Sequence, residues 1–216
     1  MEAEIYNSMS KRKVTIVDYG MGNIWSVISA LNYLNVEVKV SNSPKEILLS
    51  ETLLLPGVGS FRKAMDTLRR LNLDRAIIDS VQGKQHKILG ICLGMQLLGS
   101  GSTEDGETLG LNLFPAHVDK FSEEKLGTLK VPHTGFDQVE ADSNSKLFRG
   151  IESNSDFYFV HSYRMLSDNL SGGKAECDYG ERFLAAYEKD NVYATQFHPE
   201  KSQTNGLILL QNFMEI

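Results

Sequence analysis

The stretch Ile88-Leu89-Gly90-Ile91-Cys92-Leu93-Gly94-Met95-Gln96-Leu97-Leu98 decides the fold of this 216-residue chain. It begins as an apolar run short enough for a buried strand and ends as a run compatible with a helix. Cys92 lies at the junction between Gly90 and Gly94, in the Gly-x-nucleophile-x-Gly pattern of a nucleophile elbow. Glycines are expected there because a strand that turns abruptly into a helix leaves no room for a Cβ.

A cysteine in this position can act as a nucleophile. The free N–H groups at the start of the following helix favour a thiolate and can stabilise an oxyanion. The alternative is an ordinary buried cysteine, because free Cys is among the most buried residue types. The two flanking glycines favour the catalytic interpretation of Cys92.

The composition excludes several classes of protein. Hydrophobic residues make up 41% and charged residues 23%, which is typical of a globular protein. The net charge of -6, without a dense Lys/Arg patch, argues against a nucleic-acid partner. Cys92 and Cys177 offer neither a disulfide framework nor zinc-ligand spacing, which fits a reducing cytosol. With no apolar run of transmembrane length and no signal-peptide core, we expect a cytoplasmic protein without a membrane partner.

Strands and helices alternate through the first half of the chain. The expected strands are 14–17, 36–40, 52–55 and 88–91, and the expected helices are 24–34, one that opens at Ser43, 61–71 and 74–81. Such alternation implies right-handed crossovers. The sequence therefore predicts an α/β fold, with a mostly parallel central sheet and helices on both faces.

The second half differs, because short strand-like segments replace the long helices. It opens with a Gly- and Ser-rich loop, 99–106, which we expect to be mobile. The expected later elements are strands 117–121, 129–131, 136–140, 157–160, 174–177, 183–188 and 192–195 and a closing helix, 205–214. They predict an appended antiparallel portion. Since no linker divides the chain, we expect one domain, 13–216, after a loose N-terminal extension, 1–12.

Two glycine-containing turns follow predicted strands. The turn 18–23 has a G-x-G pattern without the third glycine or the acidic partner of a dinucleotide site, so we expect no cofactor there. The turn 56–60, Pro-Gly-Val-Gly-Ser, has two interpretations. It is either a plain connection or a segment that presents backbone N–H groups to an anion.

A candidate base lies near the end of the chain. His198 follows a strand-like run, and Glu200 is two residues further on, where an extended backbone would direct both side chains to one side. An imidazole can take the proton of Cys92 and return it to a leaving amine, while a carboxylate fixes the tautomer of the ring. The alternative is a pair of solvent-facing polar residues, and spacing alone does not bring them to Cys92.

Five motifs occur together in a fixed order. They are PGVGSF (56–61), GICLGMQLL (90–98), VPH (131–133), FVHSY (159–163) and QFHPEKS (196–202). In these motifs the chain resembles the class I (triad) glutamine amidotransferases. The resemblance extends from about Lys13 to the last residue. Within this class, DYGMGN (18–23) and VPH resemble the glutaminase subunit of imidazole glycerol phosphate synthase.

The resemblance implies a mechanism without metal or cofactor. Cys92 would attack the side-chain amide of glutamine, form a glutamyl thioester and release ammonia, with His198 as base and then acid and Glu200 orienting it. Water would then release glutamate. The implied oxyanion donors are backbone N–H groups of Leu93 and of the Gly57–Gly59 segment, namely Val58 or Gly59, reoriented on partner binding. The implied glutamine contacts are Gly57, Gln96, Glu104, His161, Ser162 and Tyr163.

The resemblance also implies a protein partner. The family forms a heterodimer with a (βα)8-barrel synthase subunit, which receives ammonia through an internal channel. There a phosphoribulosyl imidazolecarboxamide nucleotide yields imidazole glycerol phosphate and the carboxamide ribotide in histidine biosynthesis. The implied interface residues are Asn23, His133, Phe136, Tyr158 and Lys201. Four of them also have a structural interpretation: Asn23 as a turn residue, His133 as a satisfied histidine, Tyr158 as a core tyrosine and Lys201 as a surface lysine.

One segment departs from the subfamily. Val-Pro-His is usually followed there by a residue, Gly, and Trp-Asn, whereas this chain has Thr134-Gly135-Phe136-Asp137. The change leaves the triad intact but raises the alternative of a paralogue with another ammonia acceptor, such as an amidino-sugar pathway of surface polysaccharide. A stand-alone γ-glutamyl hydrolase would need no partner. A non-catalytic subunit is disfavoured because Cys92, His198 and Glu200 are all present.

Overall fold

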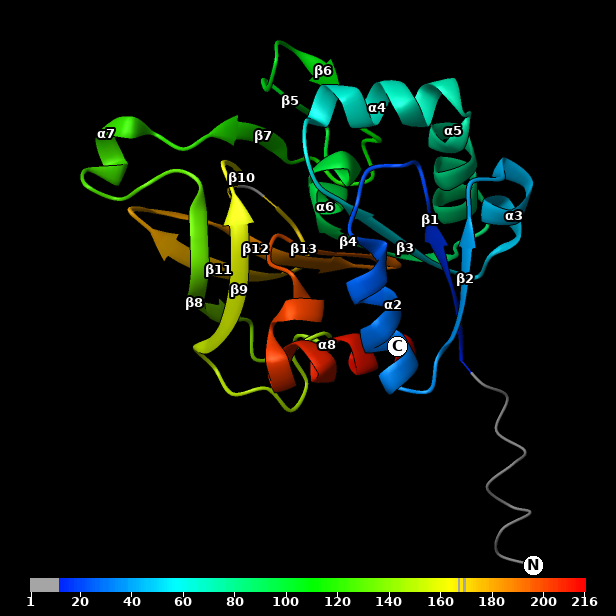
Figure 1. Ribbon diagram of the computed structural model, residues 1–216. Coiled ribbons are helices and arrows are strands. Elements are labelled where there is room, and N and C mark those ends of the chain that lie inside the picture. The colour runs from blue at the N-terminus through cyan, green and yellow to red at the C-terminus, as the bar shows by residue number, and fades with distance from the viewer. Residues whose placement is uncertain (1–11, 167, 169) are drawn as a thin grey trace, which may run out of the picture.

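A nine-stranded sheet runs through the molecule (Figure 1), in the order β2-β1-β3-β4-β13-β12-β11-β8-β9. The computed structural model describes residues 12–166, 168 and 170–216, so all but one residue of the expected N-terminal extension lie outside it. The parallel strands are β1 (Lys13–Val17), β2 (Glu37–Ser41), β3 (Thr52–Gly57), β4 (Lys87–Cys92) and β13 (Val192–Thr195). The antiparallel strands are β12 (Glu181–Lys189), β11 (Gly173–Tyr179), β8 (His133–Ala141) and β9 (Ser155–His161).

Helices cover both faces of the parallel part. One face carries α2 (Ile24–Tyr33) and α8 (Gln203–Glu215), and the other carries α4 (Phe61–Arg70), α5 (Leu73–Ile78) and α6 (Leu93–Leu98) (Figure 1). Side chains of β3 alternate between the two cores, with Leu54 on the α2–α8 side and Leu53 and Leu55 on the other. The predicted α/β fold, with its appended antiparallel portion, is confirmed.

A smaller sheet and several short helices complete the fold. The second sheet has the order β10 (Tyr163–Met165), β7 (His117–Lys120), β5 (Gly101–Ser102) and β6 (Thr108–Leu109). The short helices are α3 (Pro44–Leu49), the π-helix η1 (Asp79–Gly83), α7 (Glu123–Leu126) and the 3₁₀-helix η2 (Pro199–Lys201). No helix within the described residues has both the length and the apolar character needed to cross a bilayer.

Two local predictions differ from the structure. The expected strand 129–131 is not one, because no described strand pairs with it, and Leu129 and Val131 remain 43% and 38% exposed. The segment 99–106, expected to be a mobile loop, contains β5, which pairs with both β6 and β7. Glu104 also accepts a hydrogen bond from the N–H of Phe61 at 2.8 Å, so the loop is tied to the start of α4.

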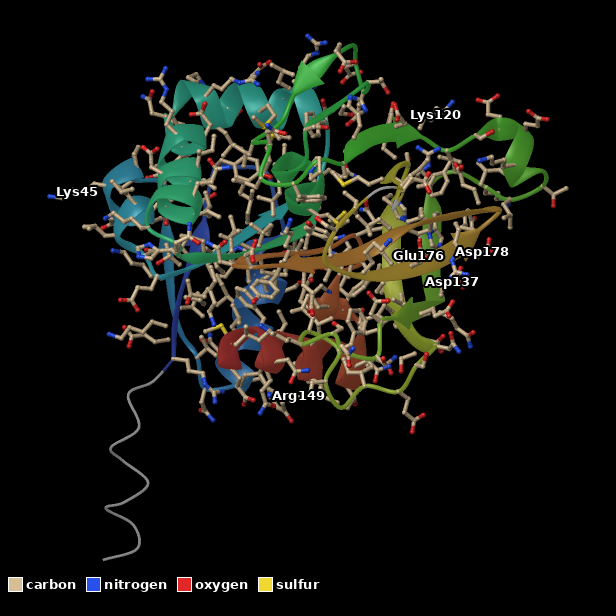
Figure 2. The ribbon with its side chains drawn as sticks, turned by 180° about the vertical axis from the view of Figure 1, so that it is seen from behind. Lys45, Lys120, Asp137, Arg149, Glu176 and Asp178 are labelled. Atoms are coloured by element: carbon tan, nitrogen blue, oxygen red, sulfur yellow. The ribbon has the colours of Figure 1, made fainter. Side chains whose placement is uncertain are left out.

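Charged side chains line the rim of the molecule (Figure 2). Lys45 extends from α3 at one end, whereas Asp137, Glu176 and Asp178 gather at the opposite, antiparallel end of the large sheet. Arg149 lies near α8, where it pairs with Glu215. These three acidic side chains lie on the antiparallel half of the large sheet.

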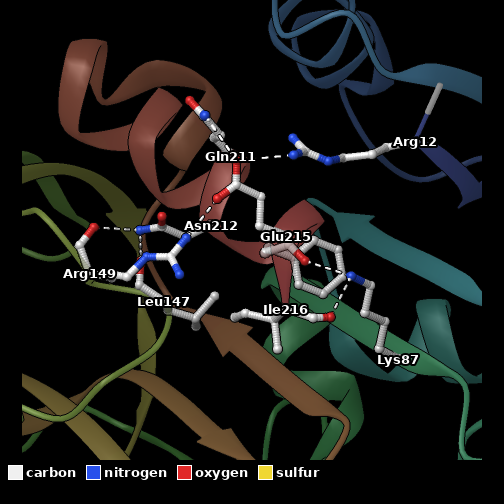
Figure 3. Close-up of polar contacts among 9 residues, drawn as sticks. Arg12, Lys87, Leu147, Arg149, Gln211, Asn212, Glu215 and Ile216 are labelled. Carbon is white, nitrogen blue, oxygen red and sulfur yellow. Dashed lines mark hydrogen bonds and ion pairs between the residues drawn. The ribbon is translucent and has the colours of Figure 1, made fainter. Parts of the chain in front are cut away.

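The last helix is fixed by polar contacts at its carboxyl end (Figure 3). Asn212 donates hydrogen bonds to the carbonyl oxygens of Leu147 and Arg149, at 2.9 and 2.8 Å. Lys87 donates to the carbonyl oxygens of Phe213 and Ile216, which the last turn of a helix cannot satisfy internally. These contacts hold α8 against the loop after β8 and against the start of β4.

Candidate active site

Cys92 lies at the end of β4, immediately before α6. Its backbone has φ 54° and ψ -110°, a conformation that costs free energy for a residue with a side chain and that is found at functional sites. Its Sγ lies 3.9 Å from the carbonyl oxygen of Val160 and 3.7 Å from Nε2 of Gln196. The junction is therefore the strained strand-to-helix turn that the glycine pattern predicted.

The flanking glycines are required by the space around the turn. A Cβ on Gly94 would lie 1.7 Å from the carbonyl oxygen of Leu55 on β3. A Cβ on Gly90 would lie 2.8 Å from backbone atoms of Gly94. Real Cβ atoms do not approach so closely, and α6 can therefore pack on β3 and β4 only with glycine at both positions.

His198 and Glu200 meet directly after β13, the strand beside β4. His198 Nδ1 lies 2.8 Å from Glu200 Oε1, and both side chains are buried. The sequence argument assumed an extended backbone, but Pro199–Lys201 forms η2, so the contact is made across a 3₁₀ turn. The turn is held to β9, because the N–H of His198 donates to the carbonyl oxygen of Tyr158 at 2.9 Å.

The free nitrogen of His198 is Nε2, which is buried and has no hydrogen-bond partner among the described residues. Burial alone would lower the pKa of His198, but Cys92 and Glu200 together raise it to about 10. Because Nε2 makes no hydrogen bond, we attribute the effect of Cys92 chiefly to electrostatic attraction. One ring nitrogen is thus fixed by a carboxylate, and the raised pKa favours a proton on the other, Nε2.

A cavity of about 510 Å³ opens beside Cys92. The predicted site residues that line it are Val58, Gly59, Cys92, Leu93, Gln96, Glu104, His161, Ser162 and Tyr163. Gly57, also predicted, pairs with Cys92 in the sheet without lining the cavity. Segments far apart in the sequence, after β3, after β4 and after β9, thus surround one space.

This combination of elbow, base and cavity agrees with a family comparison. The model of the family described as "Glutamine amidotransferase class-I" matches residues 15–216. The chain belongs to the class I glutamine amidotransferase family.

Two sequence relatives of this amidotransferase share one name. The chain is 43% identical over 203 residues to "Imidazole glycerol phosphate synthase subunit HisH 1" of Parasynechococcus marenigrum, a match that covers 94% of this chain and 97% of the relative. It is 44% identical over 207 residues to "Imidazole glycerol phosphate synthase subunit HisH" of Geobacter sulfurreducens, with 94% and 99% covered.

Solved structures show the fold of this amidotransferase in other proteins. PurLQS from Thermotoga maritima matches with a TM-score of 0.71 and 17% identity, over 95% of this chain and 99% of that one. A crystal structure of a protein named only as a glutamine amidotransferase matches with a TM-score of 0.71 and 18% identity, over 93% and 97%.

One residue beside Cys92 was missed by sequence reasoning. Gln196 is buried, donates from Nε2 toward Cys92 Sγ and accepts from Gln96 Nε2 at 2.9 Å. It opens the QFHPEKS motif, and its place two residues before His198 was the only available signal. Gln96 also donates to the carbonyl oxygen of Tyr163 at 3.1 Å, so the two amides join the elbow to the far wall of the cavity.

The pKa of the Glu104 carboxyl is raised above its ordinary value. Burial raises its pKa, Asp105 raises it further, and the hydrogen bond from the N–H of Phe61 acts in the opposite direction. Asp105 in turn accepts a hydrogen bond from Ser60 at 2.9 Å. The two adjacent carboxylates thus fix the rim of the cavity to the first turn of α4.

The predicted interface residues fall into two groups. Phe136 is 49% exposed, its ring meets Tyr158 edge-on at 5.5 Å, and Lys201 Nζ lies 5.6 Å from the Tyr158 ring centre. Asn23 is also exposed, at the N-terminus of α2, and donates to Ser26. His133 differs, because it is only 2% exposed, so any effect that it has on docking is indirect.

Proposed function

We propose that this chain is the glutaminase subunit of an imidazole glycerol phosphate synthase. It would hydrolyse glutamine to glutamate and pass the ammonia to a (βα)8-barrel partner in histidine biosynthesis. The observation that supports this most directly is the strained Cys92 beside the cavity, together with His198, whose pKa Cys92 and Glu200 raise although neither His198 nor Glu200 lines the cavity itself. Relatives named as HisH subunits, which match 94% of the chain, support the assignment of the pathway.

The chemistry follows from the contacts. Glu200 accepts the Nδ1 proton of His198, and the raised pKa of the ring favours transfer of the proton of Cys92 to Nε2 before the attack. Sγ then attacks the amide carbon of glutamine. His198 returns the proton to the leaving nitrogen, so ammonia departs and a thioester remains. A water molecule, deprotonated by the same Nε2, attacks the thioester and releases glutamate.

The negative oxygen formed in both steps needs N–H donors. Leu93 follows Cys92 directly, and Val58 and Gly59 line the same cavity just after Gly57, which pairs with Cys92 in the sheet. Gly59 has φ 105°, a conformation in which glycine is favoured and from which its peptide plane can rotate at low cost. We propose that the second donor is aligned only when the partner binds, so the isolated chain has low glutaminase activity. A misaligned donor costs roughly 10²–10³-fold in rate.

The partner would dock on the cluster of Phe136, Tyr158 and Lys201, in which Phe136 and Lys201 are exposed and Tyr158 is half-buried, and on the exposed Asn23. Both cysteines are free thiols, which supports a place in the reducing cytoplasm. This cluster contains Phe136, one of the two positions at which the chain departs from the subfamily, and that favours a second candidate. That candidate is a paralogue which performs the same glutaminase reaction for another acceptor, such as an amidino-sugar pathway.

The test measures glutamate release by the purified chain, alone and then mixed with the histidine-pathway barrel subunit of the same genome and its nucleotide ligand. We expect at least about a hundredfold stimulation, the size of one recovered oxyanion donor. Free ammonia in place of glutamine is the control for an active partner. High activity without any partner would favour a stand-alone γ-glutamyl hydrolase. No stimulation, with Cys92 still alkylated by a glutamine-like electrophile, would favour the other acceptor.

A further inference from the structure

A line of three polar contacts runs from the surface of the sheet to the wall of the cavity. Asp137 Oδ2 lies 3.4 Å from His133 Nε2, and His133 Nδ1 lies 3.0 Å from His161 Nε2. His161 Nδ1 lies 2.8 Å from the carbonyl oxygen of Tyr163. The two histidines face each other across β8 and β9, while Asp137, four residues along β8, is part-exposed near Asp178 (Figure 2).

The number of protons on this line decides which contacts are attractive. A carbonyl oxygen only accepts, so His161 Nδ1 must carry a proton, and its Nε2, without one, accepts from His133 Nδ1. The Nε2 of a neutral His133 then has no proton to offer Asp137. Two neutral rings supply two protons to three contacts, since both ends of the line are acceptors. A third proton, between His133 and Asp137, completes the line.

The surroundings keep both rings in place and mostly neutral. His133 is stacked between Tyr179 and Phe159, with ring centres 3.9 and 4.7 Å away. Burial lowers the pKa of His133 and Asp137 partly reverses this, whereas burial and the charges of His133 and His198 lower the pKa of His161 to about 3. Of the other ionisable neighbours, Tyr179 donates to the carbonyl oxygen of Lys130, and burial beside Asp137 and Asp178 raises the pKa of Cys177.

The inner end of the line is part of the cavity. The carbonyl oxygen of Tyr163 accepts from His161 and also from Gln96, which continues through Gln196 to Cys92. His161, Ser162 and Tyr163 line the cavity as one short segment. Whatever fixes His161 therefore fixes the backbone that would face a bound glutamine.

We propose that His133 is a positioning residue for glutamine, which acts through His161 on the Ser162–Tyr163 backbone and does so fully only when a proton bridges His133 and Asp137. The inference rests on the proposed glutaminase function. The side chains of Asp137 and His133 would bind no substrate themselves. It would couple the acidic edge of the sheet to the affinity of the site for glutamine, so that the KM rises as the bridging proton is lost.

The variant Asp137→Asn tests this, because an Asn amide can donate permanently to the lone pair of His133 Nε2. Because burial lowers the pKa of His133, we expect the KM of the wild-type complex for glutamine to increase as pH rises from about 5 to about 7.5, by about three- to tenfold, the effect of one net hydrogen bond. In Asp137→Asn the KM should stay low across the range, with kcat unchanged. Asp178→Asn is the matched control, since it removes the same charge nearby without touching the line. Equal pH dependence in wild type and Asp137→Asn, or equal flattening in Asp178→Asn, would overturn the proposal.

Ring ¹⁵N chemical shifts of the full chain give a second readout that needs no activity. We expect His161 to be protonated on Nδ1 throughout, and His133 Nε2 to gain a proton on acidification in wild type at higher pH than in Asp137→Asn. A proton on His161 Nε2, or identical titration of His133 in the two chains, would contradict the line. If the expected shifts were found in a chain that has no glutaminase activity, the line of contacts would stand and only the proposed function would be wrong.

Discussion

His198 and Glu200 share a single contact, Nδ1 to Oε1 at 2.8 Å, and it leaves the opposite nitrogen of the ring without a partner in the described part of the chain. Glu200 Oε2 is likewise buried and unpartnered there. A buried carboxylate held this way can stabilise an imidazolium when one forms, and it cannot rotate away toward water. The contact therefore leaves Nε2, and not Nδ1, as the nitrogen that can exchange a proton with a thiol.

Replacement of the nucleophile should separate the two half-reactions. We expect Cys92→Ala to lower glutamine-dependent turnover of the complex at least about a thousandfold, because no other group can form the thioester. Turnover with free ammonia should remain, since the partner's site is untouched. Cys177→Ala, the other free thiol, is the control and should keep glutamine-dependent turnover. Glutaminase activity retained by Cys92→Ala would show that the nucleophile is misassigned.

The ionisation of His198 should depend on its neighbour. Its pKa of about 10 lies above the ordinary value of 6.5 because Cys92 and Glu200 outweigh burial, so we expect it to fall in Cys92→Ala and in Glu200→Gln. Since the folded-state value is the higher one, the resulting stabilisation is complete below pH 6.5 and is lost as pH rises toward 10. Histidine NMR titration measures the first effect, and urea unfolding at several pH values measures the second. An unchanged pKa in both variants would refute the assignment.

Addition of one methyl group at the elbow should be costly. In Gly94→Ala the new Cβ would lie 1.7 Å from the carbonyl oxygen of Leu55, so α6 must move off β3. We expect the free energy of unfolding to drop by about 1–3 kcal/mol or more, together with loss of activity. Gly83→Ala is the control, because nothing lies within 4 Å of its Cβ position. Equal urea midpoints for the two variants would contradict the close packing described for the elbow.

The carboxyl end of α8 offers a test remote from the site. Asn212→Ala removes the donors for the carbonyl oxygens of Leu147 and Arg149, and an acceptor left unsatisfied costs about 1–3 kcal/mol. We therefore expect the free energy of unfolding, measured by urea denaturation, to fall by about 2–3 kcal/mol. Gln211→Ala, one residue earlier, removes only an exposed contact with Glu215 and should change stability by less than about 0.5 kcal/mol. Similar losses in both would mean that helix propensity, and not the Asn212 contacts, dominates.

The parallel half of the fold was predictable because its signals are local. Apolar runs such as 52–55 and 88–91 are buried on both faces, and turns with glycine follow them. The elbow was predictable for the same reason, because Gly90 and Gly94 stand where the backbone leaves no room for a Cβ. The motif 196–202 predicted the contact of His198 with Glu200, although not its 3₁₀ geometry.

What the sequence could not predict depends on long-range pairing. Nothing in 129–131 reveals that no described strand pairs with it. His133 is buried only because Tyr179 and Phe159, from β11 and β9, stack on its two faces. Gln196 meets Cys92 across 104 residues of chain. Each of these contacts forms only when the strand order is established, and no single segment of the sequence determines the strand order.

The position of β13 has a consequence for how the protein is made. This strand lies between β4 and β12, and its register pairs Val192 with Ile88 and Thr195 with Ile91. On the ribosome the elbow therefore emerges long before the strand that brings His198 to it, and β4 remains an open sheet edge meanwhile. On the proposed mechanism the thiol of a nascent chain therefore has no base. Glutamine hydrolysis would require β13 to be in place between β4 and β12 before the partner can stimulate it.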